Sequence, residues 1–221
     1  MRLLAFDTSS AAITAALHDG TALLAHATET GAQSHGELLA PTIDRVLRAA
    51  GVAAADLTHL VVGVGPGPFT GLRVGLVTAR VLAEVLGVPA YGVCSLDAIA
   101  AEAVGTGTVD GPFAVATDAR RKEVYLATYD ADGTRRTGPD VLRPADVDGE
   151  VATRPVVGAG AFLYPDTFAE PREPRLVSAG WLAAYAVRLL DSGEPLLDTT
   201  PLYLRRPDAV ESTGHKRVTQ P

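Results

Sequence analysis

Two aspartates that end short apolar runs are the first residues of this chain whose type and placement suggest a site. Asp7 follows the apolar residues 3–6, and Asp118 follows residues 113–117. Proteins with parallel sheets bind ligands at the carboxyl edge of the sheet, so charged side chains at that edge are informative. The other interpretation is that each aspartate closes its own turn, as Asp7-Thr8-Ser9 allows. The residues alone leave both interpretations open.

A cationic run comes directly after the second aspartate. It consists of Arg120, Arg121 and Lys122. Such a run could meet phosphate, RNA or an acidic partner, although basic runs are also common on solvated surfaces. The formal charge of the whole chain is −7, which disfavours nucleic-acid binding by the field of this chain alone. We therefore expect any contact with RNA to need a partner.

A loop rich in glycine and proline, residues 65–73, lies between a predicted strand and a predicted helix. Loops in this position can direct backbone N–H groups and a helix N-terminus at phosphate. This loop lacks the Lys-Ser/Thr ending of a P-loop, and Thr70 stands where a dinucleotide fingerprint needs glycine. Pro66 and Pro68 each remove a backbone donor. The pattern favours a rigid turn or a partner contact over a phosphate site.

The helix predicted after this loop has a row of small residues. They recur at every fourth position, at Gly71, Gly75, Ala79 and Ala83. Larger apolar residues occupy the other rows, at Leu72, Leu76, Val77, Val81 and Val85. A flat row of small residues lets another element approach closely. That element is either this chain's own sheet or neighbouring helix, or a helix of another molecule, and the sequence does not distinguish the two.

Metal and nucleophile chemistry are not indicated. The five histidines, at positions 18, 26, 35, 59 and 215, show no i, i+4 pair and no His-Glu-x-x-His motif. Cys94 is the one cysteine and resembles a buried small hydrophobe, and there is no Gly-x-Ser-x-Gly elbow. We expect no metal and no catalytic residue.

Composition limits the class of protein. The chain has 221 residues, 47% of them apolar and 20% charged, which is typical of a folded protein with one large or two small domains. A single cysteine cannot form an internal disulfide, and residues 1–6 are too short for a signal peptide's apolar region. With no apolar run long enough to span a membrane, we expect a cytoplasmic protein.

The elements fall into two groups separated by a Gly- and Pro-containing break at residues 105–112. Apolar periodicity predicts strands over residues 3–6, 13–18, 22–28, 60–64, 88–93, 113–117, 123–129 and 155–157. Helical spacing is found over residues 34–50, 71–86, 96–104 and 181–190. In each group a strand ends in Asp and a hairpin follows, which suggests two related halves. We expect halves at residues 1–108 and 109–206, and a polar tail at 207–221.

Four segments, in this order, resemble the bacterial TsaB (YeaZ) family. They are Leu-Ala-Phe-Asp-Thr-Ser at 4–9, the loop and helix start at 65–75, Asp-Ala-Arg-Arg-Lys-Glu-Val-Tyr at 118–125 and Pro-Leu-Tyr-Leu-Arg at 201–205. The resemblance covers nearly the whole chain. It implies an α/β fold of the ASKHA (actin/Hsp70/sugar-kinase) type, built from two ribonuclease-H-like halves.

The same resemblance implies a role in making N6-threonylcarbamoyladenosine (t6A) at position 37 of tRNAs that read ANN codons. In that family, TsaB is the non-catalytic partner of the metal-dependent transferase TsaD, and TsaE supplies an ATPase cycle. The resemblance implies a heterodimer with TsaD, a homodimer when TsaD is absent, and no cofactor of this chain's own. ATP or ADP would then lie at a shared interface, and tRNA would be contacted mainly through the complex.

Departures from the family's catalytic relatives fit a non-catalytic role. Ser95 and Ile99 stand at the positions of the histidine pair that binds metal in TsaD-like proteins. The turns at Asp7 and Asp118 lack the glycines that bring phosphate close to the backbone in ASKHA kinases. Two rivals stay open: an autonomous ASKHA ATPase or phosphotransferase with Mg²⁺-ATP held by these two aspartates, and a metallopeptidase, which the missing ligand spacing disfavours.

The expected site residues fall into two sets. Partner contacts with TsaD are expected from Phe69, Gly71, Leu72, Arg73, Gly75, Leu76, Ala79 and Arg80. A nucleotide or tRNA channel is expected at Asp7, Thr8, Asp118, Arg120 and Arg121.

Overall fold

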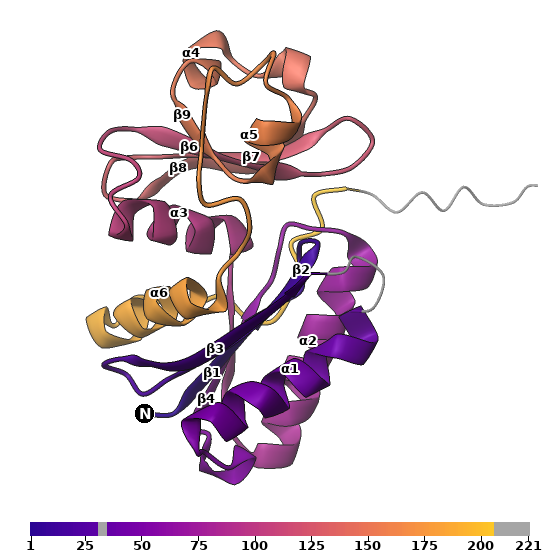
Figure 1. The fold of residues 1–221 in the computed structure, drawn as a ribbon, viewed down its shortest axis with the longest axis vertical. Coiled ribbons are helices and arrows are strands. Elements are labelled where there is room, and N and C mark those ends of the chain that lie inside the picture. The colour runs from indigo at the N-terminus through magenta and orange to yellow at the C-terminus, as the bar shows by residue number, and fades with distance from the viewer. Residues whose placement is uncertain (31–34, 206–221) are drawn as a thin grey trace, which may run out of the picture.

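A computed structural model describes residues 1–30 and 35–205 as an α/β protein with two five-stranded mixed sheets (Figure 1). The strands of the first sheet are β1 (Leu3–Asp7), β2 (Ala12–His18), β3 (Leu23–Thr30), β4 (His59–Gly63) and β5 (Ala90–Val93). They lie in the order β3-β2-β1-β4-β5. β1 is antiparallel to β2, with Leu3 opposite His18, and parallel to β4, with Phe6 opposite Val62. Every residue of β1 is buried, as expected for a central strand covered on both faces.

The second sheet repeats this pattern. Its strands are β6 (Phe113–Asp118), β7 (Val124–Tyr129), β8 (Arg135–Leu142), β9 (Pro155–Val157) and β10 (Glu170–Arg172), in the order β10-β9-β6-β7-β8. The leading strand β6 is antiparallel to β7 and parallel to β9, just as β1 relates to β2 and β4. The predicted fold class, α/β with two halves of one topology, is confirmed.

Helices cover the sheets in layers. They are α1 (His35–Ala50), α2 (Phe69–Leu86), α3 (Ser95–Gly105), α4 (Gly149–Ala152), α5 (Ala159–Leu163) and α6 (Ala179–Ser192), and single 3₁₀ turns occur at Ala54–Asp56 and Pro144–Asp146. α1 and α2 cover the outer face of the first sheet, and α3 and α6 lie between the two sheets (Figure 1). None of the helices within the described ranges is long and apolar enough to cross a membrane.

The largest buried cluster joins the two halves. Leu3 and Val61 of the first sheet belong to the same cluster as Phe113 and Val115 of the second, and residues of α3 and α6 fill the space between them. Inside this cluster the hydroxyl of Tyr129 donates to Asp97 Oδ1 at 2.8 Å. Burial raises the pKa of Asp97. Each half also has a buried cluster of its own, and this third cluster packs the two halves against each other.

The chain returns to the first half after the second sheet is complete. The backbone N–H of Ala179, at the start of α6, donates to Thr14 Oγ1 at 3.1 Å. Further on, the N–H of Leu202 donates to the carbonyl of Val64 at 2.9 Å. Thus part of the segment predicted to belong to the second half packs on the first. The boundary at residue 108 stays a prediction, and the predicted tail at 207–221 lies outside the described residues.

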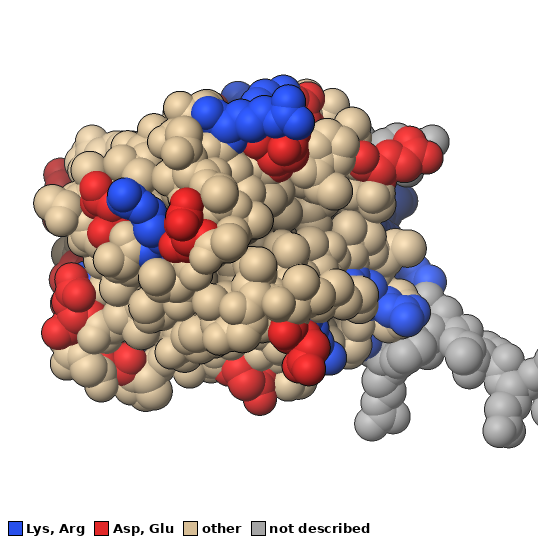
Figure 2. Space-filling model, turned by 90° about the horizontal axis from the view of Figure 1, so that it is seen from below, with Lys and Arg blue, Asp and Glu red and all other residues tan. Residues whose placement is uncertain are grey.

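Charges are dispersed on the surface that Figure 2 presents. Seen from below, acidic and basic side chains are interspersed over a mostly uncharged face. A mixed surface of this kind produces no strong field of one sign. This face does not suggest a nucleic-acid interface.

The stability of the fold depends on the protonation of Glu102 on α3. Burial, and to a lesser extent the nearby Glu173, raises the pKa of the Glu102 carboxyl from 4.5 to about 7. Since the folded state holds the Glu102 proton more tightly than the unfolded state does, the protonated carboxyl contributes stability that is complete below pH 4.5 and is lost as pH rises through 7.

We predict that Glu102→Gln removes this loss of stability. In thermal unfolding between pH 4.5 and 8, the melting temperature of the variant relative to that of the parent should rise with pH; a constant difference would contradict this.

Candidate functional site

The inner side of α2 is fixed by Thr8, at the turn after β1. The Thr8 hydroxyl donates to the carbonyl of Gly71 at 2.8 Å and accepts the N–H of Gly75 at 3.1 Å. A Cβ built on Gly71 would lie 2.5 Å from the Thr8 carbonyl oxygen, and one on Gly75 would lie 2.6 Å from Thr8 Oγ1. Glycine is required at both positions because strand and helix approach so closely.

The small-residue row of α2 is therefore internal, which is the first of the two alternatives left by the sequence. Five residues assigned to partner contacts are buried in this chain: Gly71, Leu72, Gly75, Leu76 and Ala79. A buried side chain offers no surface to another molecule, so the expectation that this small face meets a partner helix does not fit the structure. Thr8, assigned to a nucleotide or tRNA channel, is also buried and holds the helix.

The outer side of α2 carries an exposed row. Val77, Val81 and Val85 are 53%, 54% and 75% exposed, and follow one another at i, i+4 spacing. We call these three residues the valine row. Arg73 is exposed on the same ridge one turn earlier, with its guanidinium carbon 5.1 Å from the centre of the Phe69 ring. The predicted partner-contact set omitted the valine row, although the helical spacing of the valines was visible in the sequence.

Arg80, also predicted to contact a partner, binds the C-terminal segment of its own chain. Its Nε donates to Thr199 Oγ1 at 3.0 Å and its Nη2 to the Thr199 carbonyl at 2.6 Å. Nothing local in the sequence links positions 80 and 199. The guanidinium thus ties α2 to the segment that follows α6.

Asp7 is fully buried, with both carboxylate oxygens engaged. Oδ1 accepts the N–H and the hydroxyl of Ser9, each at 2.7 Å, and Oδ2 accepts the hydroxyl of Ser95 at 2.6 Å. Burial raises the pKa of this carboxyl, against the lowering effect of the serine hydrogen bonds. Ser95, at the position where the resemblance places a metal ligand in TsaD, here anchors Asp7. In the parts of the chain that the structure describes, no group of three or more His, Cys, Asp and Glu side chains is placed to hold a metal ion.

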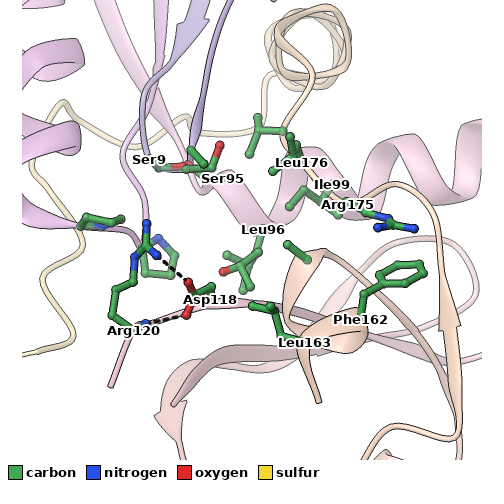
Figure 3. Close-up of a pocket in the computed structure, with 17 residues that line it drawn as sticks. Ser9, Ser95, Leu96, Ile99, Asp118, Arg120, Phe162, Leu163, Arg175 and Leu176 are labelled. Atoms are coloured by element: carbon green, nitrogen blue, oxygen red, sulfur yellow. Dashed lines mark hydrogen bonds and ion pairs between the residues drawn. The ribbon is translucent and has the colours of Figure 1, made fainter. Parts of the chain in front are cut away.

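Asp118 lines a cavity of about 370 Å³ between the two halves (Figure 3). The carboxylate is paired with Arg120, whose backbone N–H donates to Oδ1 at 2.7 Å and whose Nη1 lies 3.3 Å from Oδ2. Leu96, Ile99 and Leu176 also line this cavity, which is largely apolar. Asp7 and Asp118 are therefore both occupied by partners within the chain.

A second cavity, of about 400 Å³, brings together residues that lie far apart in the sequence. It is lined by Gly67, Pro68, Phe69, Ala119, Arg120, Arg121, Tyr125, Tyr203, Leu204 and Arg205. Phe69 thus joins Arg120 and Arg121, which had been assigned to the predicted channel. Sequence reasoning did not identify Tyr125, Tyr203 or Arg205 as site residues, although all three lie in the segments that carry the family resemblance.

The fold of this chain is shared with a kinase of low sequence identity. An inorganic polyphosphate/ATP-glucomannokinase from Arthrobacter sp. strain KM superposes with a TM-score of 0.50 at 15% identity, covering 86% of this chain and 99% of that one. At this identity the likeness concerns the fold alone. With the repeated sheet order, it places the chain among α/β proteins of the ASKHA type.

The particular family follows from closer matches. YeaZ from Pseudomonas aeruginosa has a TM-score of 0.79 at 29% identity, with 92% of this chain and 99% of that chain covered. The Escherichia coli tRNA threonylcarbamoyladenosine biosynthesis protein TsaB is 36% identical over 75% of this chain and 74% of its own. An uncharacterized protein of Mycobacterium tuberculosis is 44% identical over 94% of this chain and 93% of its own. Residues 23–186 match the TsaD family model, described as tRNA N6-adenosine threonylcarbamoyltransferase. The chain belongs to the TsaB (YeaZ) family.

Proposed function

We propose that this chain takes part in the synthesis of t6A as the non-catalytic subunit that binds and activates the transferase TsaD. The product would be t6A at adenosine 37 of tRNAs that read ANN codons. Support comes from the TsaB relatives, which are named for t6A biosynthesis, and from the likeness of this chain to the TsaD family model.

The exposed valine row is the observation that carries the binding proposal. The opposite side of α2 is locked against β1 through Thr8, so the helix presents its outer ridge as a rigid surface. Three neighbouring valines in water are costly unless another surface covers them. Related subunits assemble through equivalent elements, and this chain is itself related to TsaD. A helix of TsaD is the occupant we propose, with Arg73 at one end of the contact.

The proposed lack of catalysis is supported by the two aspartates. Asp7 is buried and accepts three hydrogen bonds, and Asp118 is paired with Arg120. The oxygens of both carboxylates thus already have partners within the chain. We propose that the chain holds no cofactor of its own, and that ATP or ADP, TsaE and tRNA are engaged through the complex. In the absence of TsaD, the same valine row would support a homodimer.

The direct test is co-expression with TsaD of the same organism, followed by size-exclusion chromatography with light scattering. We expect the two chains to elute together at a mass above that of either alone. The isolated chain should not hydrolyse ATP. If the chains elute separately and the isolated chain turns over ATP, the autonomous ATPase is the better account.

A further inference from the structure

The second cavity combines aromatic and cationic side chains. We call it the arginine–aromatic pocket and define it by Phe69, Tyr125, Tyr203, Arg120, Arg121 and Arg205. Three parts of the chain meet there: the start of α2, the turn between β6 and β7, and the segment 203–205 near the end of the described residues. A pocket assembled from such distant segments is a property of the fold, and no local sequence pattern defines it.

Two aromatic rings form an open wall of this pocket. Phe69 is 51% exposed and Tyr203 is 45% exposed, although large aromatic side chains usually bury most of their area. Their ring centres are 5.2 Å apart, with 34° between the planes. Tyr125, in contrast, is almost fully buried and forms part of the floor. Exposed rings beside cationic side chains are the elements with which proteins hold unpaired bases.

The turn between β6 and β7 has an unusual backbone. Arg120, Arg121 and Lys122 have φ values of 61°, 54° and 62°, all in the left-handed region. This conformation costs a residue with a Cβ about 1–2 kcal/mol, whereas glycine adopts it freely. Glycine would suit this turn better at every one of the three positions. The turn geometry therefore does not account for cationic side chains at these positions.

Cationic side chains gather around the pocket. The pocket and its turn hold four cations, namely the three of the turn and Arg205. Arg205 is fixed by an ion pair with Glu123 and donates from Nη1 to the Ala119 carbonyl at 3.0 Å. Arg120 pairs with Asp118. These cations gather at one place in a chain whose net charge is −7. Guanidinium and ammonium groups gathered in this way suit a phosphate group.

We propose that the arginine–aromatic pocket binds an unpaired nucleotide within an RNA strand. The base stacks against Phe69 and Tyr203, and the adjoining phosphates lie against the cations of the turn. The inference rests on the proposed function, because the RNA would be the tRNA held by the complex. A free nucleotide shares the same base and phosphate chemistry, so the test separates it from RNA.

The test measures binding of a fluorescent anticodon stem-loop RNA to the assembled complex with TsaD, by anisotropy at several salt concentrations. One variant is Arg121→Gly with Lys122→Gly, which keeps the turn and removes two charges. We expect its affinity to fall about tenfold or more and its salt dependence to flatten by about two charges. We expect Tyr203→Leu to lose about fivefold or more through stacking. Arg143→Gly, an exposed arginine outside the pocket, is the matched control and should bind like the parent.

Assembly is checked first, by sizing each variant with TsaD. If the complex does not form even with the parent chain, the proposed function fails, and the same RNA titration is then made on the isolated chain at low salt. Unchanged RNA affinity in the glycine and Tyr203→Leu variants overturns the pocket assignment, in the complex or alone. A free nucleotide is the ligand, and not RNA, if free ATP displaces the RNA from the parent and the variants lose ATP binding.

Discussion

Replacing Val77 and Val81 together by aspartate should abolish the complex with TsaD while leaving this chain folded. Each side chain is about half exposed, so the change adds charge to the surface without opening the core. At an interface, the two carboxylates would be desolvated beside apolar partner atoms. We expect the affinity for TsaD, measured by calorimetry, to fall about 100-fold or more.

A matched control makes this prediction specific. Leu163 on α5 is also 54% exposed, the same as Val81, but lies in the second half of the chain. Leu163→Asp should bind TsaD as the parent does. All variants should melt within about 2 °C of the parent, as surface substitutions usually do. Full binding by the Val77/Val81 variant would remove α2 from the interface.

The largest expected effect on stability comes from Gly63, the last residue of β4. A Cβ at this position would lie 1.7 Å from Asp7 Oδ2 and 2.8 Å from Ser95 Oγ. The added methyl group cannot fit unless the fully buried carboxylate moves away from its serine partners. We expect Gly63→Ala to destabilise the fold by about 3 kcal/mol or more, because it combines overpacking with the loss of a buried hydrogen bond.

Thermal unfolding measures this effect directly. For a chain of this size, such a loss corresponds to a melting temperature lower by about 6 °C or more. Gly36→Ala on α1 is the control, since a Cβ there meets nothing within 4 Å. It should leave the melting temperature unchanged or raise it slightly. A Gly63→Ala protein that melts with the parent would show that Asp7 and Ser95 are not packed as described.

Elements with a strong apolar period were predictable from the sequence. Leu3–Asp7, Phe69–Leu86 and Phe113–Asp118 lie within two residues of their predicted bounds. The repeated strand-then-Asp pattern correctly indicated two halves of one topology. These elements are buried on at least one face, and burial is what apolar periodicity reports.

Elements at the edges of the second sheet were not predictable in the same way. β8 is polar and contains Gly138 and Pro139, which disfavour a strand by propensity. It forms because it is an edge strand that pairs with β7. α5 and β10 are only five and three residues long, too short to show a period. Tertiary pairing, and not local preference, decides such elements.

The orientation of α2 and the long-range contacts at the candidate site were also not predictable from the sequence. Periodicity identified the rows of α2 but could not say which row faces inward, since both small and large apolar residues can pack on a sheet. The hydroxyl of Thr8, 63 positions before Gly71, settles the orientation. The Arg80 contact with Thr199 and the meeting of Phe69 with Tyr203 are also long-range. Spacing within a segment carries no information about such contacts.

The most direct test of the central claim is reconstitution of t6A formation with purified components. The transferase TsaD, TsaE, the threonylcarbamoyl donor and unmodified tRNA are incubated with or without this chain, and the t6A nucleoside is quantified by mass spectrometry after digestion of the tRNA. We expect t6A only when this chain is present, and none with the Val77/Val81 aspartate variant. Equal t6A formation in the absence of this chain would contradict this expectation.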